Sequence, residues 1–205
     1  PVAQTSVIDW NKGVNLVTYS EEPNQSVWTK FQTSISADDE TAPDGQSTAD
    51  KLTASGSGTS IVYNTIPFAS ENYMVSVYIK PGTSRYVYLR NQTDGDVRGV
   101  QWYDLQTASV AGSSGIVGDA NIESANNGFY RISLECQPTP SGSVHYTLLG
   151  LTSSGTNAEA GVAGQYVHVW GFQAERKTTI GPYVRTEATA QSTPVLLPAG
   201  LTTGR

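Results

Sequence analysis

The chain has 205 residues, enough for one domain with short arms, and 38% of them are hydrophobic, which is too many for a disordered chain. The formal net charge is −6 with no cluster of Lys or Arg, which argues against nucleic-acid binding. No apolar run approaches the roughly 20 residues of a membrane-spanning helix, so a membrane partner is not expected either. Only 15% of the residues are charged and 11 are Tyr, a balance that favours short strands and turns over helices.

Residues 1–13 are polar and irregular, which predicts an N-terminal arm that docks through Trp10. The strand-forming part is expected over residues 14–187. Residues 188–205 are rich in Thr, Ala and Pro and predict a C-terminal arm, with Leu196 and Leu197 as docking anchors. The chain begins at Pro1 without a signal-like segment, and we expect it to be processed or cut from a longer protein.

Alternation of apolar and polar residues predicts strands throughout residues 14–187, and no window shows a helical period. The expected strands cover 14–19, 33–36, 47–53, 61–66, 73–80, 85–90, 99–105, 129–136, 144–151 and 165–175. Their spacing and the turns between them are typical of a β-sandwich. Cys136 falls within this pattern and is expected to be a buried small hydrophobic residue, and a lone cysteine excludes an internal disulfide framework.

The clearest expected pair of strands covers 73–80 and 85–90, with Pro81 and Gly82 between them, and predicts a hairpin. Val75, Val77, Val87 and Leu89 are expected to face the core. The outer face of the hairpin would then carry Tyr78, Tyr86, Tyr88 and Arg90, extended by Trp102 and Tyr103 on a neighbouring strand. Sugars stack on flat aromatic rings, so this face is the candidate for contact with a glycan or a partner.

Three alternatives to that binding face stay open. The face can be an ordinary Tyr-rich sheet surface, an interface with a neighbouring subunit, or a core face if the register is the opposite one. Trp28 and Trp170 are expected to be core anchors and not ligand contacts.

Catalytic signals are weak. His145 and His168 lie in strand patterns, no Cys/His cluster suggests zinc, and no Gly-x-Ser-x-Gly elbow is present. Carboxylates gather in expected turns, at Asp38, Asp39, Glu40 and Asp44 and on either side of Gly95, where solvated side chains are the ordinary interpretation. We therefore expect a protein that is not an enzyme and requires no cofactor.

Five segments occur in a recognisable order: Asn15–Glu21, Ala42–Leu52, Val75–Gly82, Asn127–Ser133 and Tyr166–Glu175. In this order they resemble a domain of tailed-phage virion proteins that is related to the carbohydrate-binding jelly-roll modules of glycan-degrading enzymes. The resemblance covers residues 14–186 and implies a two-sheet antiparallel jelly-roll β-sandwich. It departs from the family at Arg185, where a Pro is usual, so the route of the closing segment is expected to differ, and the tail after Thr186 has no counterpart.

The resemblance also implies a structural calcium ion between the first strand region and the last core strand. Glu21, Asp44 and Glu175 are the expected ligands, because calcium needs several oxygens but only a few carboxylates. The alternative is that Glu21 and Glu175 cap turns or pair with Arg or Lys.

The function implied by the resemblance is that of a non-catalytic phage virion protein, in a capsid decoration, tail fibre or tail spike. The expected partners are other virion subunits, including further copies of the chain, and a host-surface glycan. The alternative is a carbohydrate-binding module of a larger glycan-degrading enzyme or depolymerase.

Overall fold

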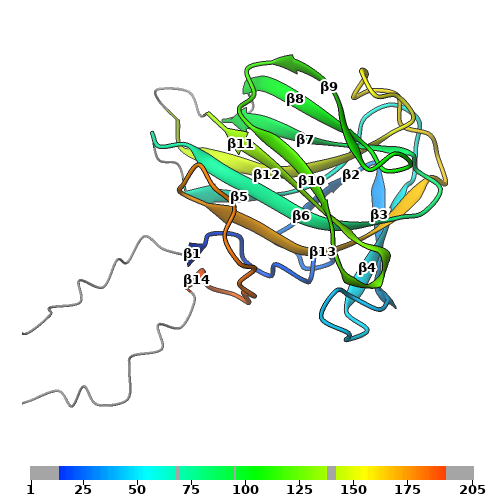
Figure 1. The fold of residues 1–205 in the computed structure, drawn as a ribbon, viewed down its shortest axis with the longest axis horizontal. Helices are drawn as coiled ribbons and strands as arrows, with labels where there is room; N and C mark the ends of the chain where they lie inside the picture. Colours follow the sequence, from blue (N-terminus) through cyan, green and yellow to red (C-terminus); the bar gives the residue numbers. More distant parts are fainter. Residues whose placement is uncertain (1–13, 68–69, 95, 138–141, 193–205) are drawn as a thin grey trace, which may run out of the picture.

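The strands stack as two layers in the computed structural model, which describes residues 14–67, 70–94, 96–137 and 142–192 (Figure 1). Each layer is a six-stranded antiparallel sheet. The expected docking anchors Trp10, Leu196 and Leu197 lie outside the described residues. In the described part of the chain, no helix is long and apolar enough to cross a membrane.

Sheet I has its strands in the order β10, β11, β6, β13, β4 and β3. Their bounds are Ala120–Ser124, Tyr130–Cys136, Tyr73–Pro81, Tyr166–Glu175, Ala49–Ala54 and Thr33–Glu40. Sheet II has the order β2, β5, β12, β7, β8 and β9. Their bounds are Thr29–Phe31, Ser60–Pro67, Val144–Thr152, Tyr86–Thr93, Asp96–Asp104 and Ser109–Gly115.

Consecutive strands alternate between the two sheets over much of the chain, since β4, β6, β11 and β13 belong to sheet I and β5, β7 and β12 to sheet II. This back-and-forth course is the jelly-roll arrangement, and it confirms the expected all-β sandwich. A short pair, β1 (Val14–Asn15) with β14 (Gln191–Ser192), lies beside sheet I, and its pairing continues past the domain boundary expected at residue 187 (Figure 1).

The main core lies between the sheets. Val75, Val77 and Ile79 of β6 face it from sheet I, and Val87 and Leu89 of β7 face it from sheet II, all fully buried as the alternation predicts. Burial of each such side chain stabilises the fold by about 1.5–3 kcal/mol.

Aromatic side chains complete this core. The Trp28 and Phe172 rings are 4.6 Å apart, and Tyr103 on sheet II donates to the Ser133 carbonyl on sheet I at 2.7 Å. The expected burial of Trp28 and Cys136 is confirmed.

The expected hairpin between residues 73–80 and 85–90 is wrong. Strand β6 pairs with β11 and β13, while β7 pairs with β12 and β8, so the segment between them crosses from one sheet to the other. Ser84 holds this crossing: its N–H donates to the Tyr166 carbonyl of sheet I, and its hydroxyl donates to the Tyr86 and Thr152 carbonyls of sheet II.

Several segments differ from expectation for local reasons. Residues 38–40 were expected in a loop, yet they end β3 after a bulge in which Asp38 takes a left-handed φ of 55°. Strands β2, β9, β10 and β14 carry few large apolar residues, and the alternation did not reveal them. The consecutive strands β7 and β8 pair with each other.

Candidate ligand-binding surface

The six aromatic and Arg residues expected on one face lie on three different surfaces, so that prediction is wrong. Tyr78 lies on the outer face of sheet I, whereas Tyr86, Tyr88 and Arg90 lie on the outer face of sheet II. Tyr103 is fully buried in the main core, and its neighbour Trp102 points to the opposite side, since successive strand residues alternate.

Half of the outer face of sheet II is covered by other side chains and is not accessible to solvent. Tyr88 is fully buried and Trp102 is 3% exposed, and their ring centroids are 6.5 Å apart. Ala111 of β9 and Ala158 of the β12–β13 connection pack against this pair. Burial raises the pKa of Tyr88 to about 12, as expected of a phenol removed from water. These two rings form a second core and not a contact surface.

The other half of this face is open and carries side chains from four strands. We call it the open platform, formed by Phe31 (β2), Tyr63 (β5), Tyr146 (β12) and Arg90 (β7). The centroids of Tyr63 and Tyr146 are 5.2 Å apart at 61°. Leu148 lies opposite both Tyr63 and Arg90 in the strand register and forms the buried floor between them.

Arg90 gives the open platform a positive charge. Its Nε atom is buried without a hydrogen-bond partner among the described residues, and its Nη2 donates to the Tyr88 hydroxyl at 3.5 Å. The guanidinium also lies 5.4 Å from the centre of the Tyr88 ring, which holds it against the sheet. A fixed guanidinium beside aromatic rings is suited to a ligand that has a flat apolar face and polar groups at its rim.

Sequence analysis missed Tyr63, Tyr146 and Phe31. The alternation in residues 61–66 and 144–151 was visible, but it does not say that β5 and β12 are neighbours. Only the strand order brings the two tyrosines together.

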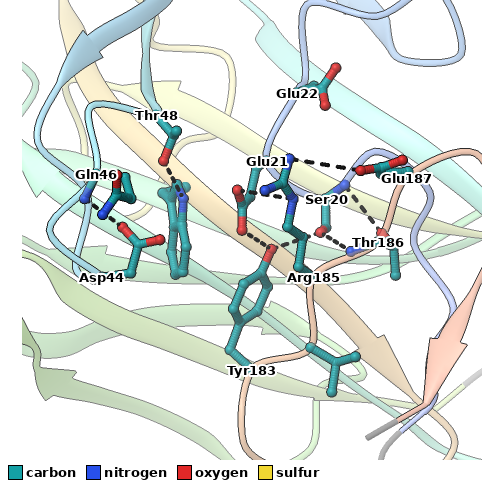
Figure 2. Close-up of polar contacts among 12 residues, drawn as sticks. Ser20, Glu21, Glu22, Asp44, Gln46, Thr48, Tyr183, Arg185, Thr186 and Glu187 are labelled. Carbon is teal, nitrogen blue, oxygen red and sulfur yellow. Dashed lines mark hydrogen bonds and ion pairs between the residues drawn. The ribbon is translucent and has the colours of Figure 1, made fainter. Parts of the chain in front are cut away.

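The three residues expected to bind calcium are already engaged by other groups, and Figure 2 shows the contacts of two of them, Glu21 and Asp44. Glu21 accepts a hydrogen bond from the Tyr183 hydroxyl at 3.0 Å and pairs with Arg185 at 3.5 Å. Glu175 pairs with Lys177 at 2.5 Å and accepts from the Gly181 N–H at 2.9 Å, while Asp44 accepts from the Gln46 N–H.

This arrangement does not fit a metal ion. No group of three or more His, Cys, Asp or Glu in the described part of the chain is placed to hold one. Arg185 stands where the related domains usually have Pro, and it supplies a positive charge beside Glu21. This agrees with the alternative expectation that Glu21 pairs with Arg or Lys. Burial raises the pKa of Glu21, and its bonds to Tyr183 and Arg185 oppose that rise.

The two histidines and the cysteine that the sequence singled out are each buried or paired with another side chain. His145 is fully buried and stacked on Tyr73 at 4.8 Å, and burial lowers its pKa to about 4. His168 pairs with Asp39 at 3.1 Å. Cys136 is fully buried, which raises the pKa of its thiol.

Comparison with known proteins finds similarity to solved structures only at low sequence identity. No family model matches, and no curated protein matches. The enzymatically active domain of tailspike protein 4 from bacteriophage CBA120 is similar at 14% identity and a TM-score of 0.47, over 78% of this chain and 21% of that one. This chain thus spans about a fifth of the tailspike chain.

Two carbohydrate-binding modules are similar to most of the chain. The CBM22-1 xylan-binding domain of Xyn10C from Paenibacillus barcinonensis has 16% identity and a TM-score of 0.47, over 82% of this chain and 99% of that one. The module CBM6cm-2 of Cellvibrio mixtus lichenase 5A, solved with cellotriose, has 12% identity and a TM-score of 0.42, over 80% and 99%. At these values the ligands of those proteins do not transfer to this chain.

Proposed function

We propose that the chain is a non-catalytic binding module of a phage virion that contacts a glycan on the host surface through the open platform. The observation that carries the proposal is the pair of half-buried rings, Tyr63 and Tyr146, beside the guanidinium of Arg90, which takes part in none of the ion pairs among the described residues. A sugar stacks its C–H face on such rings, and a guanidinium binds its hydroxyl or carboxylate oxygens.

The positive charge selects among glycans. Arg90 lies on β7, at one edge of the platform, and is the charged member of the four residues that form it. An acidic sugar, such as a uronate, offers a planar carboxylate that matches the guanidinium. We therefore propose acidic polysaccharide as the preferred ligand of the open platform.

A glycan array with the purified chain tests this proposal, with Tyr63→Ala and Arg90→Gln as variants and Tyr166→Ala as a matched half-buried tyrosine on sheet I. Binding to acidic glycans is expected for the wild type and for Tyr166→Ala, and about tenfold weaker binding for either platform variant. If the wild type binds no glycan on the array, the adhesive function is refuted.

Membership of a virion rests on the five segments of the sequence resemblance. The same platform would also serve a module attached to a glycan-degrading enzyme, which is the alternative. Electron microscopy of an intact particle, with the chain located by antibody, tests the virion assignment: labelling of the particle surface supports it, and its absence favours the enzyme-attached module.

A further inference from the structure

A concave surface lies on the opposite side of the sandwich from the open platform, on the outer face of sheet I. It is a cleft of about 320 Å³ lined by three aromatic rings: Tyr78 and Tyr183 are half-buried, and Trp170 is 5% exposed, so its expected burial is confirmed and it lends only an edge to the cleft. Its rim is formed by Pro43 and Asp44 of the β3–β4 connection and by Ala125 and Asn126 of the β10–β11 connection. We propose that this cleft binds one neutral hexopyranose residue of a glycan. The ligand class rests on the proposed glycan-binding function, whereas the site itself is independent of the open platform.

The three rings form a continuous floor and not a cage. Trp170 lies 4.5 Å from Tyr183 and 5.3 Å from Tyr78 between ring centroids, at angles of 52° and 65°. Rings this close contact one another, so no ligand fits between them. A ligand must lie on top of them, chiefly over the two tyrosines, which suits the flat C–H face of a pyranose.

The floor is fixed in place before any ligand arrives. The Trp170 indole N–H donates to the Thr48 hydroxyl at 3.1 Å, and the Arg131 guanidinium lies 5.2 Å from the centre of the Tyr78 ring. Arg131 is itself buried and donates to the Gly181 carbonyl and to Ser76. Preorganised rings cost little entropy on binding.

Tyr183 is held by its hydroxyl from behind the cleft (Figure 2). The hydroxyl donates to Glu21 at 3.0 Å and lies 2.7 Å from the Ser20 hydroxyl. The ring comes close to β13 because a bulge there contains Gly171 with a φ of 63°, where a side chain would press on both Tyr78 and Tyr183. The polar end of Tyr183 is therefore occupied, and its ring face is what the cleft offers.

The rim is rigid as well. Asn126 Nδ2 donates to the Pro43 carbonyl at 3.2 Å, and Asn127 Nδ2 donates to the Ala42 carbonyl at 2.7 Å. These two bonds join the β3–β4 and β10–β11 connections across the cleft. The Asp44 carboxylate accepts from the Gln46 N–H through Oδ1 and takes part in none of the ion pairs in the described part of the chain.

The charge of the rim decides the ligand class. Asp44 offers carboxylate oxygens that accept hydrogen bonds from sugar hydroxyls and repel an acidic sugar. The cleft volume lies at the lower end of small-molecule sites, roughly 300–1,000 Å³, which matches one sugar ring and not a long segment. The two faces thus differ in sign: Arg90 favours an acidic residue, and Asp44 a neutral one.

Saturation-transfer NMR with the methyl glycosides of glucose, galactose, mannose and N-acetylglucosamine tests the cleft in the purified chain. Asp44→Asn is the principal variant because Asp44 is exposed, and Asp96→Asn is the matched exposed control. Binding of at least one neutral glycoside is expected, with affinity about tenfold lower in Asp44→Asn, the equivalent of one charge-assisted hydrogen bond, and unchanged in Asp96→Asn. Tyr78→Ala is a second variant, provided that its unfolding transition stays cooperative.

Four outcomes overturn the proposal. They are no binding of any neutral glycoside to the wild type, binding unaffected by both cleft variants, tighter binding of an acidic than of a neutral glycoside to the wild-type cleft, and self-association abolished by Tyr78→Ala, which would make a second copy the occupant. The Tyr63→Ala variant distinguishes the cleft from the open platform. If this variant loses binding of acidic glycans but still binds neutral glycosides, the two surfaces are separate sites. Failure at one face leaves the result at the other face intact.

Discussion

The ring of Tyr88 lies directly over Gly150, its cross-strand partner on β12. A methyl group at position 150 would overlap the ring carbons and the hydroxyl of Tyr88. The absence of a side chain on β12 thus allows a fully buried tyrosine on the outer face of a sheet, and it closes half of a surface that would otherwise be exposed.

Gly150→Ala is therefore expected to destabilise the fold by about 1–3 kcal/mol, the usual cost of overpacking. Urea unfolding at neutral pH measures this change. In a Tyr88→Ala background the same substitution should cost close to nothing, because the overlapping ring is absent. An equal cost in both backgrounds would show that the contact with Tyr88 is not the cause.

Many strands of the sandwich could be predicted from the sequence, because the alternation of apolar and polar residues along a strand is a local property of the chain. Strand β6 was expected at 73–80 and is found at Tyr73–Pro81, with the expected residues facing the core. Strand partners are not local. The alternation in β6 and β7 is the same whether they pair with each other or cross between sheets, and they cross.

The candidate site was harder to predict for the same reason. Tyr88 does face outward, as expected, yet Ala158 of the connection after β12 packs against the buried cluster that contains it, and nothing in that Ser- and Gly-rich segment signals this contact. Tyr63 and Tyr146 became neighbours only through the register of β5 with β12. The cleft on sheet I forms where the β3–β4, β10–β11 and β13–β14 connections meet, and the sequence pattern does not predict that these connections lie close together.

Asp50 should make stability depend on pH between about pH 4 and pH 7. Its side chain is buried on β4, Oδ1 accepts from the Asp38 N–H, and Oδ2 has no partner among the described residues. Burial raises the pKa of Asp50 from 3.8 to about 7, with the charges of Asp38 and Glu22 adding to the rise. The folded state then binds more protons than the unfolded state between these values, so the free energy of unfolding falls as pH rises across them.

Asp50→Asn is expected to remove this dependence and to gain stability relative to the wild type between pH 4 and pH 8, on the order of 2–4 kcal/mol. His145 acts in the opposite sense, since its lowered pKa makes stability rise with pH up to about 6.5. Denaturant unfolding of wild type and variant at pH 5 and pH 8 isolates Asp50, because the contribution of His145 is common to both proteins and cancels in their difference. A constant difference between wild type and variant at every pH would contradict the assignment.

Removal of calcium is expected to leave the unfolding midpoint unchanged. The carboxylates that the family resemblance selected are paired with Arg185 and Lys177, and a ligand bound only to the native state would raise the midpoint. Thermal unfolding with EDTA and with excess calcium measures this. A midpoint that falls with EDTA and recovers with calcium would restore the metal site.

Tyr183→Phe should destabilise the fold more at pH 8 than at pH 4. The substitution keeps the ring in the cleft but removes the hydrogen bond to Glu21 and the contact with Ser20. Glu21 is 6% exposed, so at high pH the variant leaves a buried carboxylate with Arg185 as its remaining partner in the described structure, at a cost of about 1–3 kcal/mol.

At low pH Glu21 is protonated and the cost is smaller, because burial already raises its pKa and loss of the Tyr183 bond raises it further. Tyr78→Phe is the matched control, since no hydrogen bond of the Tyr78 hydroxyl is among those of the described residues, and it should be neutral at both pH values. Urea unfolding of the two variants at pH 4 and pH 8 makes the comparison. Equal destabilisation by Tyr183→Phe at both values would mean that the hydroxyl supports Ser20 and the backbone, and that Glu21 does not depend on it.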